Sequence, residues 1–151
     1  YWCIDSLADW NNKGKFNEEK LSSEQAFLRG EYAKILNVCQ SEKAITQGAF
    51  YDLMYVNTDR SHFDDTKLYA YMRRYKNELI LVVANFDDKA VHASVRIPQH
   101  LFDFWQIKPQ ATIKAKDLLS GQSMVCPLNP DNDIPLQIPV NQSRIMKFVI
   151  E

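Results

Sequence analysis

The chain has 151 residues, 46% of them hydrophobic and 25% charged, which is the length and composition of about one globular domain and not of a disordered chain. Its 18 basic and 19 acidic residues give a net charge of −1, without the positive surplus that typifies a nucleic-acid-binding protein. Four widely spaced glycines exclude a glycine-rich phosphate loop. The longest apolar run, residues 79–84, is far shorter than the roughly 18 residues of a membrane span.

The first third of the chain has helical periodicity. Ser22 and Gln25 have the spacing of a capping box, in which each side chain bonds the backbone N–H of the other. Apolar residues then recur at helical intervals, which predicts a long amphipathic helix that ends near Gln40. A second, short helix is expected over residues 41–48, because this segment begins with serine and ends with glycine.

From residue 49 onward the pattern alternates with a period of two, which indicates strands. Residues 79–86 are an apolar run of the kind that is covered on both faces of a sheet. Short strands joined by turn residues favour an antiparallel β-sandwich over alternating strands and helices. The expected strands cover residues 68–75, 79–86, 90–97, 111–117, 122–125, 136–140 and 144–150.

The change of periodicity also predicts how the chain is divided. Residues 1–48 are expected to form a helical leader, and residues 49–151 a C-terminal β-sandwich domain. The fold class that follows is mainly β, an antiparallel sandwich preceded by one long and one short α-helix.

No constellation of reactive side chains indicates an enzyme. The cysteines form no CxxC pair and the histidines show no metal-ligand spacing, so we interpret them as ordinary thiols and as surface or loop histidines. These residues are Cys3, Cys39 and Cys126, and His62, His92 and His100. The sequence therefore predicts no catalytic residue, no metal site and no cofactor.

Aromatic residues make up 12% of the chain, and they are the only candidates for binding a ligand. Tryptophan and tyrosine rings stack on the apolar C–H faces of sugars, while the sugar hydroxyls need polar neighbours. Trp2, Trp10 and Trp105 each have an aspartate or asparagine nearby, so carbohydrate contact is a hypothesis, above all for Trp10 and Trp105. The alternative is that these rings pack in the core, where aromatic residues bury large areas.

An ordered series of segments resembles one protein family. The resemblance lies in the order of the segments. First comes the long helix with its Leu-Arg, Tyr and Ile-Leu pattern, and then the short helix before Gly48. The Phe-Tyr-Asp-Leu-Met-Tyr stretch and the strand that ends in Asn-Phe follow. The segments are residues 6–17, 21–25, 28–37, 41–45, 50–55, 69–74, 79–88 and 143–150. The series resembles the end of the catalytic barrel and the C-terminal β-domain of bacterial enzymes of the alpha-amylase superfamily.

This resemblance implies a Greek-key β-sandwich appended to a (β/α)8 barrel in a parent enzyme that cleaves or rearranges α-glucosidic bonds. The catalytic acids of such an enzyme would precede Tyr1. The chain is then expected to be a non-catalytic accessory domain that braces the barrel of the same parent chain. An α-glucan-binding module and an unrelated β-sandwich interaction domain stay open as alternatives. The sequence also leaves open the parent's substrate, whether it is cytoplasmic or exported, and its oligomeric state.

The long helix carries a specific expectation about packing. Its apolar stripe is expected to pack against the β-domain, with part of the stripe left open for the barrel. The stripe consists of Leu28, Tyr32, Ile35 and Leu36.

Overall fold

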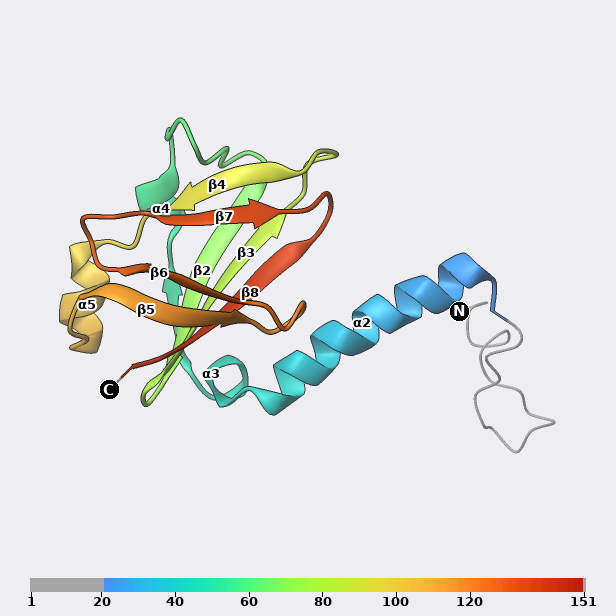
Figure 1. Cartoon of the computed structure of the whole chain (residues 1–151), viewed down its shortest axis with the longest axis horizontal. Helices are drawn as coiled ribbons and strands as arrows, with labels where there is room; N and C mark the ends of the chain where they lie inside the picture. The colour runs from blue at the N-terminus through green and yellow to red at the C-terminus, as the bar shows by residue number, and fades with distance from the viewer. Residues whose placement is uncertain (1–20, 151) are drawn as a thin grey trace. The chain divides into compact units, whose positions relative to one another are not determined.

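A computed structural model describes residues 21–150 of the chain (Figure 1). These residues fall into two compact units, one that runs to Cys39 and one that starts at Gln40. The predicted division into residues 1–48 and 49–151 stays a prediction. The elements in chain order are α2 (Ser23–Ser41), α3 (Lys43–Thr46), β1 (Ala49–Asp52), α4 (Met54–Asn57), β2 (Leu68–Tyr75), β3 (Glu78–Asn85), β4 (Val91–Val95), α5 (Gln99–Trp105), β5 (Gln110–Asp117), β6 (Ser123–Leu128), β7 (Ile134–Ile138) and β8 (Ser143–Val149).

Helix α2 begins with the predicted capping box. The Gln25 backbone N–H donates to the Ser22 hydroxyl at 3.2 Å, and the Ser22 N–H donates to the Gln25 side-chain oxygen at 3.0 Å. The apolar stripe of the helix is 41 to 64% exposed at Leu28, Tyr32, Ile35 and Leu36. The packing of these four side chains against the β-domain stays a prediction. The β unit closes its core with side chains of its own two sheets and of its short helices.

The β unit consists of two antiparallel sheets. The large sheet has the strand order β1-β2-β3-β8-β5-β6, and the small sheet pairs β4 with β7. Figure 1 shows β4 and β7 in front of the large sheet, with the core between them. The predicted fold class, a mainly β protein with one long and one short helix before the strands, is confirmed.

The two faces of the large sheet differ in what they contact. Alternate residues of β2 and β3, such as Met72 and Leu81, point into the core between the sheets. On the opposite face of β3, Ile80 is 0% and Val82 is 8% exposed. Strand β3 is therefore buried on both faces, as its apolar run predicts.

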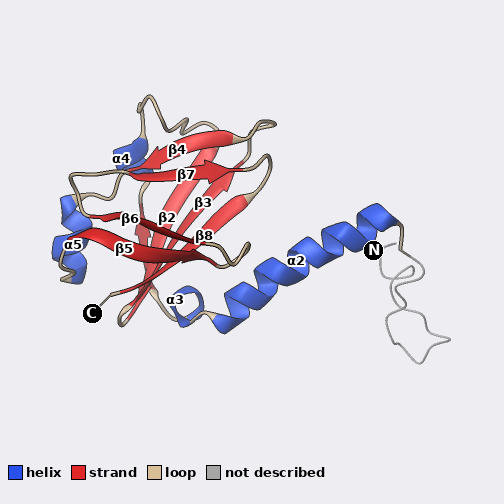
Figure 2. Cartoon of the chain, viewed as in Figure 1, coloured by secondary structure: helices blue, strands red, loops and turns tan. Residues whose placement is uncertain are grey.

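Three short elements were not predicted: β1, α4 and α5. They have only four to seven residues, too few for a period to be visible in the sequence. Helix α5 follows the extended Pro98 and buries Leu101, Phe102 and Trp105 against the core. The helix is followed by Gln106, which has a left-handed backbone with φ 52°. Figure 2 shows α4 and α5 on the same side of the strands.

A buried side chain at the end of helix α4, Asn57, bonds the helix to the rest of the β unit. The Asn57 amide donates to the carbonyl oxygens of Leu53 at 2.8 Å and Arg96 at 3.1 Å, and its oxygen accepts from the Arg96 N–H at 2.9 Å. Asn57 is 0% exposed, so these bonds replace the water that the amide loses on folding. The position of α4 is thereby set by a residue that follows β4.

Candidate functional site

The first candidate site is the junction between α3 and the outer side of the large sheet. Arg73 on β2 donates hydrogen bonds to the carbonyl oxygens of two consecutive α3 residues, at 3.2 and 2.7 Å. Lys147 on β8 donates to Glu42 at 2.6 Å and lies 3.1 Å from a carboxylate oxygen of Glu78. We call Glu42, Arg73 and Lys147 the α3 clasp, because together they hold the start of α3 on the sheet.

The electrostatics of the clasp favour the charged lysine. Burial alone would lower the pKa of Lys147, but the hydrogen bonds and negative charges of Glu42 and Glu78 raise it above its usual value. The side chain of Lys147 is 22% exposed and that of Glu42 only 14%. Water therefore screens this pair less than it screens an ion pair on the open surface.

Aromatic side chains gather beside the clasp, on the face of β1 and β2 that points away from the core. The ring of Tyr71 lies 5.4 Å from that of Phe50 and 5.9 Å from that of Tyr69, measured between ring centroids. Phe50 is 49% and Tyr69 42% exposed. We call Phe50, Tyr69 and Tyr71 the outer face. It is an apolar surface on a sheet whose core lies on the other side.

The second candidate site is a cluster of five rings that β1, α4 and α5 bring together. Its members, which we call the ring cluster, are Tyr51, Tyr55, His100, Phe104 and Trp105. Tyr51 is central, since its ring centroid lies 5.6 to 6.4 Å from the other four. The rings of His100 and Phe104 stack with an interplanar angle of 11°. Tyr55 is 58% and Phe104 63% exposed, so part of the cluster faces solvent.

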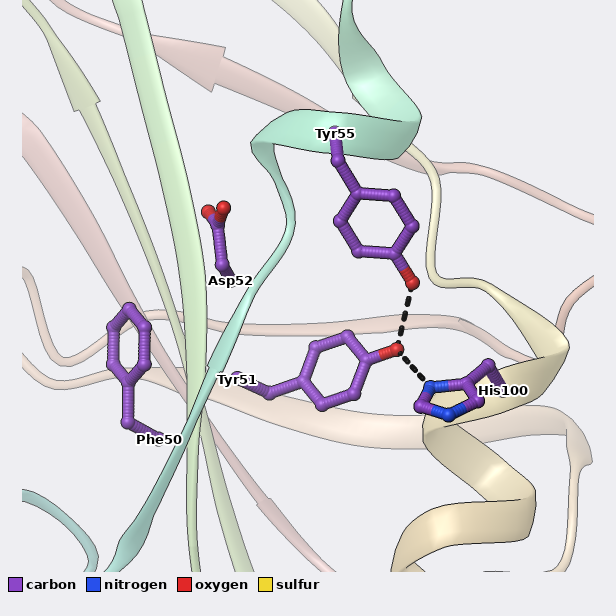
Figure 3. A pocket seen from close by; sticks show the side chains of 5 residues that line it. All are labelled: Phe50, Tyr51, Asp52, Tyr55 and His100. Carbon is purple, nitrogen blue, oxygen red and sulfur yellow. Dashed lines mark hydrogen bonds between the residues drawn. The ribbon is translucent and has the colours of Figure 1, made fainter.

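An open hollow lies beside the ring cluster, lined by Phe50, Tyr51, Asp52, Tyr55 and His100 (Figure 3). The Tyr51 hydroxyl lies 2.7 Å from the Tyr55 hydroxyl and 2.7 Å from Nδ1 of His100. Figure 3 shows Phe50 and Asp52 on the opposite side of β1 from Tyr51, as strand alternation requires. Burial and the hydrogen bond with Tyr55 raise the pKa of Tyr51 above its usual value, so this hydroxyl stays protonated at neutral pH.

The structure places the two predicted carbohydrate-contact residues differently. Trp10 lies outside the described residues. Trp105 belongs to the ring cluster but is only 6% exposed, and its ring meets the Tyr51 ring edge-on at 67°. A sugar contact by either tryptophan stays a prediction, and for Trp105 core packing accounts for the burial. Within residues 21–150, no group of three or more His, Cys, Asp or Glu side chains is arranged to hold a metal ion.

Sequence reasoning missed both the α3 clasp and the ring cluster. Tyr51 and His100 are 49 positions apart, and the two helices that complete the cluster were not expected. His100 was interpreted as an ordinary surface or loop histidine; it is exposed, but it is also bonded to a buried tyrosine. The one available signal was the density of aromatic residues from Phe50 to Tyr55.

The comparison with protein families gives one match within this unit. Residues 61–107 match the family model described as Maltogenic Amylase, C-terminal domain. This segment is similar to the C-terminal domain of maltogenic amylases. The match runs from the loop before β2 to the residues just after α5, so the matched segment includes His100, Phe104 and Trp105 of the ring cluster.

Solved amylase structures resemble most of the chain in fold. The maltogenic alpha-amylase AmyB from Thermotoga neapolitana has a TM-score of 0.55 at 14% identity, over 78% of this chain and 24% of its own. An alpha-amylase from Geobacillus thermoleovorans has a TM-score of 0.58 at 13% identity, over 89% and 25%. An Anoxybacillus alpha-amylase has a TM-score of 0.56 at 12% identity, over 91% and 26%. Similarity at this level shows a shared fold.

The resemblance seen in the sequence, to the C-terminal domain of the alpha-amylase family, is thereby confirmed. The chain spans about a quarter of the length of these solved amylases, from 24 to 26%. The comparison with curated proteins gave no match. Among the described helices, none has the length and apolar character needed to cross a membrane.

Proposed function

We propose that the domain braces the catalytic barrel of an alpha-amylase-type enzyme that acts on α-glucosidic bonds, and that it takes no part in the chemistry. The α3 clasp is the observation that carries this proposal. A single residue, Glu42, separates the end of α2 at Ser41 from the start of α3 at Lys43, and its carboxylate is bound to Lys147 in the large sheet. The segment that continues α2 is therefore anchored to the β unit.

The exposed stripe of α2 supports the proposal. Leu28, Tyr32 and Leu36 are each more than half exposed, and water contact with side chains of this size is unfavourable by about 1.5–3 kcal/mol each relative to full burial. A helix of 19 residues with such a stripe needs a covering partner. The last helix of a catalytic barrel has this partner, because the barrel strands cover its inner face.

The outer face supplies a second surface for the same role. Phe50 on β1 and the two tyrosines of β2, Tyr69 and Tyr71, point away from the domain core, and β2 also carries the clasp arginine. An apolar, aromatic surface of this kind is typical of an interface between domains that stay together. In this proposal the barrel covers the outer face, and the clasp holds α3 on the large sheet.

The proposal is tested in the full-length enzyme by differential scanning calorimetry of a double variant, Arg73→Met with Lys147→Met. We expect the wild-type barrel and β-domain to unfold in one cooperative transition, because each stabilises the other. Removing the clasp should separate this into two transitions and should lower the temperature of the barrel transition.

Lys67→Met is the matched control for the loss of a paired lysine. Lys67 forms an ion pair with Asp87 at 2.9 Å, but that pair is not part of the clasp, and the control should keep the single transition. Circular dichroism checks that the double variant keeps its strands. A double variant that retains its strands and unfolds in the same single transition as the wild type would refute the bracing role.

A further inference from the structure

Part of the ring cluster faces solvent and part of it belongs to the core. Tyr55, His100 and Phe104 are exposed, and the stacked rings of His100 and Phe104 form a double aromatic surface next to the open hollow. We propose that this surface binds a glucose unit of an α-glucan chain, with its aromatic rings against the apolar face of the sugar. The choice of an α-glucan rests on the proposed function, because it is the substrate class of the parent enzyme.

The hydrogen-bonded chain from Tyr55 through Tyr51 to His100 favours a polyol over an apolar ligand. A neutral imidazole carries one proton, and each phenol carries one. If Tyr51 donates to Nδ1 of His100, the other ring nitrogen offers an N–H at one end of the chain, and the Tyr55 oxygen offers a lone pair at the other. If the hydrogen bonds run in the reverse direction, the Tyr55 hydroxyl offers the donor and the second nitrogen of His100 offers the acceptor.

One donor and one acceptor are thus available at the two ends of the chain, whichever way the protons are ordered. A sugar hydroxyl both donates and accepts, so a pair of neighbouring hydroxyls matches either order. Figure 3 shows the second nitrogen of His100 on the side away from Tyr51. An aliphatic partner surface would leave these polar groups unpaired, which disfavours it.

The surface is also preorganised. Tyr51 is 8% exposed and is held by the edge of the Trp105 ring, and Asn57 fixes the helix that carries Tyr55. Rings that are already fixed lose little conformational freedom on binding, which leaves more of the interaction energy for affinity. In this proposal Trp105 acts through Tyr51 as a positioning residue.

The test is affinity electrophoresis of the 151-residue chain in gels with soluble starch, with titration of maltoheptaose followed by NMR. We expect starch to retard the wild type, and we expect the amide shifts to change in β1, α4 and α5. Phe104→Ala should weaken binding about tenfold, the size of one lost ring contact. Tyr55→Phe keeps the ring and removes only the hydroxyl, so weaker binding by this variant would support the hydrogen-bonded chain.

The matched control is Phe86→Ala, since Phe86 is an equally exposed phenylalanine (72%) outside the ring cluster. Its binding should equal that of the wild type, and cellohexaose should not cause the same shifts. The proposal would be overturned if starch did not retard the wild type. It would also be overturned if both Phe104→Ala and Tyr55→Phe bound as tightly as the wild type does. Self-association that Phe104→Ala abolishes without any effect of starch would overturn it as well. These results leave the calorimetric test of bracing unaffected, so the two proposals fail separately.

Discussion

Gly48 offers a sharp test of how tightly α3 is held against the large sheet. A Cβ at this position would lie 2.1 Å from the carbonyl oxygen of Ala44 in α3 and 2.6 Å from that of Arg74 in β2. Real Cβ atoms essentially never come closer than 3.0 Å to such atoms, so one backbone segment would have to move by at least 0.9 Å. Because the obstacle is backbone on both sides, no change of side-chain rotamer can relieve it.

We therefore expect Gly48→Ala to push α3 off β2 and to weaken both hydrogen bonds that Arg73 donates to α3. Overpacking of this kind and the loss of hydrogen bonds with a charged donor together destabilise by about 3 kcal/mol. With a slope of about 2 kcal/mol per molar urea, the unfolding midpoint of the β unit should fall by about 1.5 M.

Gly30→Ala is the control within the same chain. A Cβ at Gly30 would meet nothing within 4 Å, and alanine in a helix is about 1 kcal/mol more favourable than glycine. Urea unfolding followed by circular dichroism should thus show no loss of stability for Gly30→Ala. If Gly48→Ala unfolded at the midpoint of the wild type with an unchanged slope, the close approach of α3 to β2 would be wrong.

Two further predictions concern buried polar groups. Burial alone would raise the pKa of Asp117, but hydrogen bonds from Ser120 and Arg144 outweigh it and lower the pKa. Asp117 thus stabilises the fold above its unfolded pKa of 3.8, and this stability is lost as the pH falls through the lower folded pKa. Urea unfolding should show Asp117→Asn as less stable at pH 7, with the difference shrinking below pH 4; a constant difference would contradict this. Asn57→Ala leaves buried backbone groups unpaired and should lower the free energy of unfolding by about 2–3 kcal/mol, and an unchanged urea midpoint would refute it.

Most strands could be predicted because apolar and polar residues alternate along them with a period of two. The run in β3 is buried on both faces, and its composition alone indicates this. The long helix was also predictable, because the capping box of Ser22 and Gln25 marks its first turn. In each case, neighbours in the sequence determine the local structure.

The candidate sites could not be predicted in the same way. The α3 clasp joins Glu42 to Lys147, 105 positions apart, and the ring cluster depends on helices of four and seven residues. These contacts arise only once the strand order is known. Trp105 shows the limit most clearly, since an aromatic residue next to polar ones looks the same in the sequence whether its ring faces solvent or the core. Bracing of the barrel and sugar binding stay predictions.

The place of β8 in the large sheet has a consequence for how the chain folds during synthesis. Strand β8 lies between β3 and β5 but follows every other strand of the described chain. Until it has left the ribosome, β3 and β5 each keep an open edge with unpaired backbone groups, and such edges promote aggregation. A nascent chain that stops short of Ser143 therefore has two half-sheets and no closed core. The large sheet can therefore close only after β8 has been synthesised. Chains that are interrupted earlier expose strand edges to chaperones and proteases.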